Sequence, residues 1–348
     1  MKNRKSLFIL LMFFSIYMGL AQDSIQDMLS SNSRPLKKNI RISFQDSRNN
    51  QTFMPISILK GKNEGPVFTI VAGVHGFEYP PIVGVQELLR EIDINSLSGT
   101  LIIIPVANTA SFFSRTSIVN PNDQVNLNGA FPGKSNGSVT QKIAHFITTN
   151  IIPASDVFLD IHGGGVNEDL IPFALFYDNG NYPQQTKKAR RLSEVSGFEY
   201  IVSYPFTIRD DEPAKYVFKQ ASQDGKVALS FESGKLGNVQ NDAVSLIKKG
   251  VYNILVEMKM YDKATGPSPK LIQLNNQTYI KSNEKGLFYS NLKAGDSVEE
   301  GEVVGYITDE FGEKLKEYKA PTSGIILYKI STPPVNVDDT LMCLSSKL

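Results

Sequence analysis

Four continuous, mostly apolar runs restrict the folds open to this chain more than any other feature. They cover residues 67–72, 101–106, 157–161 and 227–231. Runs without polar alternation are typical of strands that are covered on both faces, as in a largely parallel sheet. Helix-like stretches separate or follow them, at residues 81–91, 139–148, 184–196 and 239–260. Because strands alternate with helices, we expect an α/β domain with a mixed, largely parallel sheet and flanking helices.

Two alternating segments precede the first apolar run. Ile40, Ile42 and Phe44 are separated by polar residues, and residues 54–59 carry a similar pattern. A period of two is typical of strands that bury one face. We therefore expect an antiparallel pair at one edge of the sheet.

The composition changes at residues 263–269, where turn-forming residues indicate a linker. Beyond this linker, short strand patterns recur between glycines, which predicts a small all-β domain. We therefore expect an α/β domain at residues 22–265 and an all-β domain at residues 266–348.

The chain begins with the pattern of a secretory signal peptide. Three basic residues precede an apolar run that ends near Leu20, and residues 19–21 form a small-residue cleavage site. This pattern predicts cleavage before Gln22 and export to the periplasm or the medium. A transmembrane anchor is the alternative, but the run is short for a bilayer span. We expect no membrane insertion after cleavage.

Charge and cysteine content narrow the possible functions. Residues 1–21 hold three of the 36 basic residues and none of the 35 acidic ones, which leaves 33 against 35, a net charge of about −2 after cleavage. No basic patch indicates nucleic-acid binding. Cys343 is the only cysteine, so no disulfide can form within one chain and the core must supply the stability.

Two of the three histidines stand at the ends of apolar runs. His75 and Glu78 follow the first run, and His162 ends the third. The carboxyl ends of the strands form the ligand-binding edge of an open α/β sheet, so these side chains can converge. Two imidazoles and one carboxylate suit a catalytic Zn²⁺ that keeps a position for water. His145 lies in a helical stretch with apolar neighbours and is interpreted as structural.

Two further carboxylates accompany these residues, and each has two interpretations. Asp160 precedes His162 by two and so points to the same face of a strand, where it could orient the imidazole or only cap a loop. Glu232 ends the fourth apolar run. It could exchange a proton with water beside a metal, or it could form a salt bridge or a helix cap.

Four motifs carry a family resemblance when they are taken together. In chain order they are His-Gly-Phe-Glu (75–78), Asn-Leu-Asn-Gly-Ala-Phe-Pro-Gly (126–133), Asp-Ile-His (160–162) and Phe-Glu-Ser-Gly (231–234). With these motifs the chain, from about residue 40, resembles the succinylglutamate desuccinylase/aspartoacylase family, which shares the zinc carboxypeptidase fold. The resemblance implies one zinc ion per chain, bound by His75, Glu78 and His162. It also implies that Glu232 is the general base and that Arg115 polarises the scissile carbonyl.

One departure from the family pattern concerns the substrate. The family commonly has Asn-Arg where this chain has Asn128-Gly129, and that pair grips a substrate carboxylate. Arginine binds a carboxylate through two hydrogen bonds, whereas glycine carries no charge. Asn128 is kept as a substrate-binding candidate, and Arg209 or Lys235 could replace the missing charge.

The C-terminal residues 286–324 resemble a biotinyl/lipoyl-like β-sandwich. The tripeptide Met258-Lys259-Met260 lies upstream of it, at the end of a helical stretch, and is interpreted as ordinary helix sequence. The family resemblance implies that this extra domain flanks the active site and narrows access to it.

These observations predict a zinc-dependent hydrolase that cleaves an amide, or an ester, in a small acylated substrate such as an N-acyl amino acid. A zinc carboxypeptidase acting on peptides or cell-wall fragments is a second possibility, although the glycine at position 129 counts against recognition of a C-terminal carboxylate. A metal-bearing binding module is the non-enzymatic alternative. The sequence makes no prediction about oligomeric state.

Overall fold

The structure is a computed structural model that describes residues 25–263 and 265–348. The expected signal peptide at residues 1–21 lies outside the described residues. Within the part of the chain that is described, no helix is both long and apolar enough to span a bilayer.

The four apolar runs form the centre of one large sheet. They correspond to β3 (Asn63–Ala72), β4 (Ser98–Ile104), β5 (Val157–His162) and β9 (Val227–Glu232). These strands lie in the order β4-β3-β5-β9 and pair in parallel. The expected parallel centre of an α/β domain is therefore confirmed.

The predicted antiparallel pair also forms. β1 (Leu36–Gln45) pairs with β2 (Gln51–Lys60), and β2 pairs with β4, so β1 is one edge of the sheet. Ile42 and Phe44 of β1 are buried. Two core clusters cover the sheet, and successive residues of a central strand face different clusters, as Ile70 and Val71 do. This is why these strands are apolar at nearly every position.

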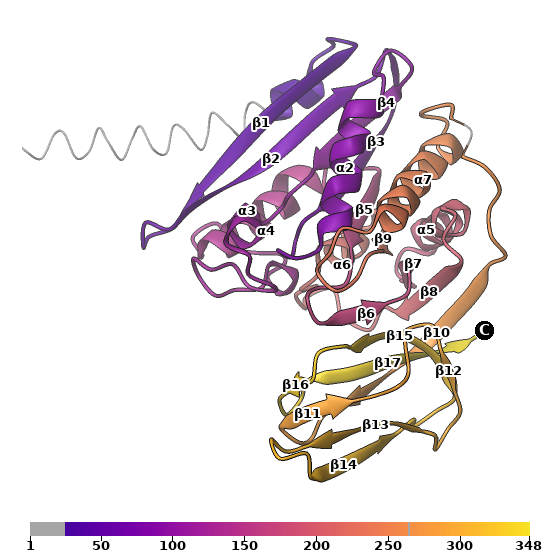
Figure 1. Cartoon of the computed structure of the whole chain (residues 1–348). Helices are drawn as coiled ribbons and strands as arrows, with labels where there is room; N and C mark the ends of the chain where they lie inside the picture. The colour runs from indigo at the N-terminus through magenta and orange to yellow at the C-terminus, as the bar shows by residue number, and fades with distance from the viewer. Residues whose placement is uncertain (1–24, 264) are drawn as a thin grey trace, which may run out of the picture.

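Helices supply both covering layers (Figure 1). On one face lie α2 (Tyr79–Glu91), α5 (Pro183–Val195) and α7 (Asn241–Glu257), whose buried side chains join one cluster. On the other face lie α4 (Val139–Phe146), which continues as a π-helical turn, and α6 (Val217–Gln223). The short helix α3 (Thr109–Ser114) follows β4. The sequence did not predict α3 or α6.

The sheet continues beyond β9 into the C-terminal part of the chain. Next to β9 lie β7 (Phe173–Asp178), which is antiparallel to it, and β8 (Tyr200–Pro205). β10 (Ile272–Lys281) then pairs with β8 at one end and with β17 (Thr340–Lys347) along most of its length. In the described residues this gives a mixed sheet of 13 strands, and the sequence did not predict its strands β7 and β8.

The C-terminal part is all β, as expected. β17 pairs with β15 (Gly324–Ile330), and β15 pairs with β12 (Ser297–Val298) and with β6 (Glu168–Leu170). A separate four-stranded sheet packs against them around a third core cluster. Its strands, in spatial order, are β14 (Lys314–Lys319), β13 (Val303–Thr308), β11 (Gly286–Tyr289) and β16 (Pro334–Val335).

Candidate active site

The ends of three central strands bring the candidate metal ligands and Glu232 together. The loop after β3 carries His75 and Glu78 and enters α2 at Tyr79. Gly76 allows this loop to lie against residues 111–117, because a Cβ atom there would approach the Thr116 carbonyl oxygen to 2.2 Å. His162 ends β5 and is paired with Glu232 at the end of β9. The strand ends predicted to form the site therefore meet.

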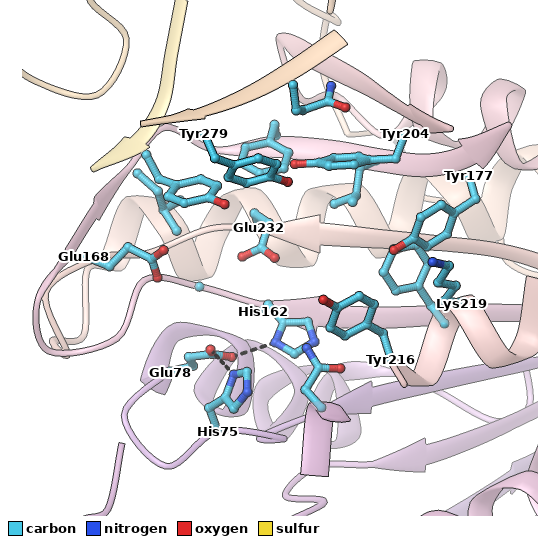
Figure 2. A pocket seen from close by; sticks show the side chains of 18 of the residues that line it. His75, Glu78, His162, Glu168, Tyr177, Tyr204, Tyr216, Lys219, Glu232 and Tyr279 are labelled. Atoms are coloured by element: carbon cyan, nitrogen blue, oxygen red, sulfur yellow. Dashed lines mark hydrogen bonds and ion pairs between the residues drawn. The ribbon is translucent and has the colours of Figure 1, made fainter. Parts of the chain in front are cut away.

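His75, Glu78 and His162 form a compact group (Figure 2). The Glu78 carboxylate bridges the imidazoles, with 2.5 Å from Oε1 to His75 Nδ1 and 2.9 Å from Oε2 to His162 Nδ1. One ligand atom from each residue lies within 4.8 Å of the others. This spacing and this donor set suit a zinc ion with three protein ligands and an open position.

A second layer of polar groups fixes both imidazoles. The Nε2 atom of His162 lies 2.8 Å from Asp160 Oδ2, and Nε2 of His75 lies 3.3 Å from Asn126 Oδ1. The Nδ1 atoms of both rings are thereby left facing Glu78. Metal-binding histidines usually hold their second ring nitrogen in this manner, so the surroundings of the group also fit a metal.

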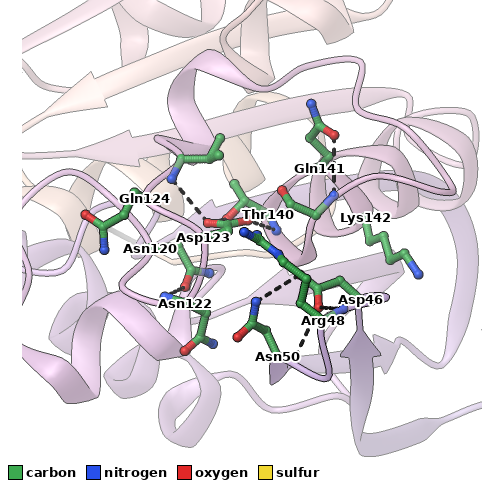
Figure 3. A network of polar contacts seen from close by, with 12 residues as sticks. Asp46, Arg48, Asn50, Asn120, Asn122, Asp123, Gln124, Thr140, Gln141 and Lys142 are labelled. Carbon is green, nitrogen blue, oxygen red and sulfur yellow. Dashed lines mark hydrogen bonds and ion pairs between the residues drawn. The ribbon is translucent and has the colours of Figure 1, made fainter.

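The loop that carries Asn126 and Asn128 is anchored by a polar network (Figure 3). Asp123 accepts hydrogen bonds from the backbone N–H and hydroxyl of Thr140 at the start of α4, both at 2.9 Å. Lys142, further along α4, donates to the Gln45 carbonyl oxygen of β1 at 2.8 Å. The loop is thus tied to elements outside the site.

Burial and mutual proximity shift the pKa values of these groups. Burial alone would raise the pKa of Glu78, but His75 and His162 outweigh it and lower the pKa to about 2. Burial likewise opposes protonation of His162, yet Asp160 and Glu78 raise its pKa well above the ordinary value. Burial raises the pKa of Glu232 well above its usual range; His162 opposes this rise and Glu78 adds to it. The site thus concentrates buried carboxylates around two imidazoles.

A cavity of about 710 Å³ opens above this group. His75, Glu78, His162 and Glu232 all line it, together with Glu168 of β6. Burial, and then the charge of Glu78, raise the pKa of Glu168 to about 7. Sequence reasoning missed Glu168, because β6 is only three residues long and no motif marks it.

The C-terminal strands form one wall of the cavity. Tyr279 of β10 and Tyr328 of β15 line it beside Tyr204 of β8. Burial raises the pKa of all three hydroxyls, and Tyr279 interacts with the other two. These hydroxyls therefore stay protonated at neutral pH and can donate hydrogen bonds to a ligand.

The other residues singled out from the sequence lie in different places. Asn128 lines the cavity, and its Oδ1 atom is buried with no hydrogen-bond partner among the described residues. Arg115 is exposed at the left-handed end of α3 and does not line the cavity. Gly129 lines a separate hollow. His145 lies on α4 and does not line the cavity.

The two cations proposed to replace the missing arginine are engaged elsewhere. The exposed Arg209 side chain pairs with Asp211 at 3.0 Å and does not line the cavity. Lys235 pairs with Asp169 at 2.7 Å and is likewise absent from the cavity lining. The structure therefore brings together the metal group, Asp160, Glu232 and Asn128, and leaves these two cations and Arg115 outside.

The mixed α/β sheet, with His75, Glu78, His162 and Glu232 at its strand ends, defines an α/β protein with a hydrolase-like site. Residues 64–258 match the model of the succinylglutamate desuccinylase/aspartoacylase catalytic domain. The chain is 30% identical over 316 residues to the N-alpha-acetyl-L-2,4-diaminobutyric acid deacetylase of Halomonas elongata, with 87% of this chain and 89% of that protein covered. This chain belongs to the succinylglutamate desuccinylase/aspartoacylase family.

Solved structures agree with this assignment. A succinylglutamate desuccinylase from a Silicibacter species superposes with a TM-score of 0.80 at 25% identity, covering 90% of this chain and 95% of that one. The product-bound ectoine utilization protein EutE (DoeB) of Ruegeria pomeroyi gives a TM-score of 0.79 at 22% identity, covering 89% and 95%. The match to the Ruegeria protein shows that the two chains share a fold.

Proposed function

We propose that this protein is a zinc-dependent deacylase that hydrolyses the amide bond of an N-acyl amino acid. The observation that carries the proposal is the convergence of His75, Glu78, His162 and Glu232 in one cavity. When bound by the His-Glu-His group, zinc would polarise the scissile carbonyl and lower the pKa of a water molecule to about 7.

Residues of the chain would transfer the proton, orient the His162 ring and bind the substrate amide. Glu232, paired with His162 across the β5–β9 ladder, would accept a proton from the attacking water and deliver it to the leaving nitrogen. Asp160 would hold the His162 ring in position through its 2.8 Å contact. The unpaired Oδ1 atom of Asn128 is suited to accept a hydrogen bond from an amide N–H of the substrate.

Arg115 is our candidate for binding the scissile carbonyl oxygen. Its loop contacts the loop of His75 directly, since the Gly76 backbone N–H donates to the Ser117 carbonyl oxygen at 3.1 Å. The role requires the exposed Arg115 side chain to turn toward the cavity when substrate is bound.

An N-acetylated diamino acid is the substrate we favour within this class. The Halomonas relative is named for such a substrate. The lining of the cavity also offers a partner for the free ammonium group, because Glu168 lies outside the metal group and its carboxyl could accept a hydrogen bond from that ammonium.

We also propose a localisation and a domain organisation for the protein. The pattern at residues 1–21 supports export to the periplasm or the medium. Residues 22–265 would form the catalytic domain, and residues 266–348 a biotinyl/lipoyl-like sandwich that narrows access. Tyr279 and Tyr328 in the cavity wall support this second role.

Hydrolysis of a panel of N-acetyl amino acids that includes N-acetyl-2,4-diaminobutyrate tests the proposal. We expect activity that chelation removes and zinc restores, and a loss of about 100-fold or more in kcat for E232Q. Chelator-insensitive activity or a fully active E232Q protein would refute it. Peptides with free and amidated C-termini form a second arm, because only a carboxypeptidase requires the free terminus. Stoichiometric metal without any hydrolysis would favour the binding module.

A further inference from the structure

Lys219 is the only lysine or arginine that lines the cavity in the described part of the chain. It lies on α6 and is half-buried. In Figure 2 its side chain and that of Glu168 lie on opposite sides of Glu232. The ammonium group therefore sits to one side of the reacting centre, where it could reach a substituent of a bound substrate.

Within the described residues this ammonium group forms no ion pair, although the charge of Glu212 is close enough to raise its pKa. Its Nζ atom lies over the rings of Tyr177, Phe206 and Tyr216, at 5.2, 5.7 and 6.0 Å from their centroids. Among the described residues it makes no ion pair and no hydrogen bond with another side chain. Burial, and next the charge of Lys215, lower its pKa.

Aromatic faces compensate a half-buried cation only in part. They attract the positive charge but accept none of the three hydrogen bonds that a lysine can donate. A half-buried charge without a hydrogen-bonded counter-ion is destabilised, and an anion brought in by a ligand would reduce that cost. A single cation beside hydroxyl groups, here those of Tyr177 and Tyr216, suits a singly charged carboxylate better than a doubly charged phosphate.

We infer that the Lys219 ammonium group binds the carboxylate of the amino acid part of the substrate, in place of the arginine that this chain lacks at position 129. The inference rests on the proposed deacylase function for the identity of the substrate. Lys219 is thus a specificity-determining residue, and it takes no part in bond cleavage.

The test compares K219M, K219R and the control K188M. Methionine keeps an unbranched apolar stem between the aromatic rings, while Lys188 is an exposed lysine of α5 that does not line the cavity. The ligands are N-acetyl-2,4-diaminobutyrate and its carboxamide, which differ only in the charge at issue. An N-succinyl amino acid amide carries its carboxylate on the acyl group instead of the amino acid part. It therefore shows which of these two carboxylate positions Lys219 binds. The readouts are kcat, KM and, by calorimetry on zinc-loaded E232Q protein, Kd.

We expect K219M to raise KM and Kd for the free acid by about tenfold or more, with kcat within about twofold and the carboxamide unaffected. K219R should retain most of the preference for the free acid, and K188M should behave as wild type. The inference is overturned if K219M weakens the binding of acid and carboxamide equally or weakens the binding of neither. It is also overturned if K219M weakens only the binding of the succinyl amide. If wild type hydrolyses none of these compounds, the proposed function fails, and calorimetry with the acid and the carboxamide still decides the role of Lys219.

Discussion

Replacing Glu168 by glutamine should make the metal-free protein more stable, by an amount that depends on pH. Burial, followed by repulsion from Glu78, raises the pKa of Glu168 from 4.5 to about 7 in the folded chain. The folded protein therefore keeps this proton between these pH values while the unfolded chain releases it. Raising the pH across that range favours unfolding.

The size of the effect follows from the two pKa values. Their difference corresponds to at most about 3 kcal/mol of lost stability above pH 7. We expect about 1 to 3 kcal/mol, because the side chain keeps some contact with solvent. Glutamine preserves the shape of the side chain and carries no charge. The free energy of unfolding of E168Q should therefore equal that of wild type near pH 4.5 and exceed it by a growing amount up to pH 8.

Urea unfolding in the presence of a chelator, at pH 4.5, 6 and 8, measures this difference. E64Q is the matched control, since Glu64 is an exposed glutamate at the start of β3. A stability difference between E168Q and wild type that does not change with pH would refute the reasoning, as would a gain of equal size in E64Q.

Three further expectations follow from the site and the core. In D160N the His162 ring loses its charged partner, so zinc affinity measured by competition with a chelator should fall by about 10- to 100-fold; unchanged affinity would contradict the role of Asp160. Removing the metal should lower Tm, because zinc at 100 times its Kd contributes about 2.7 kcal/mol; a Tm that ignores both zinc and chelator would count against the metal site. G250A should destabilise the protein by about 1 to 3 kcal/mol in urea unfolding, since its Cβ would lie 2.7 Å from Phe231; an equally stable variant would show that α7 can shift.

Much of the catalytic half could be predicted from local sequence. A strand covered on both faces is apolar at nearly every position, so β3, β4, β5 and β9 stand out as near-continuous runs. A polar residue at the end of such a run then lies at the ligand-binding edge, and for that reason His75, Glu78, His162 and Glu232 were found. The antiparallel pair β1–β2 was found through its alternation.

The substrate-facing part could not be predicted in the same manner. Lys219 lies on a seven-residue helix with no motif around it, and only the packing of α6 brings its side chain to the cavity. Glu168 depends on β6, a three-residue strand held by a partner more than 150 residues away in the chain. Arg209 and Lys235, chosen for their charge and their place in the sequence, are paired with carboxylates elsewhere.

The wall of the cavity depends on a junction that no local pattern marks. β10 pairs with β8 over only three residues, Ile272–Leu274, and then with β17 along the rest of its length. Through β17 and β15 the same ladder reaches β6, so Glu168 and Tyr328 are placed by strands from both parts of the chain. Because the wall opposite the metal group is held by the C-terminal strands, changes in β10 or β15 should alter substrate preference while the geometry of His75, Glu78 and His162 is kept. Metal chemistry and substrate choice thus rest on different parts of one sheet.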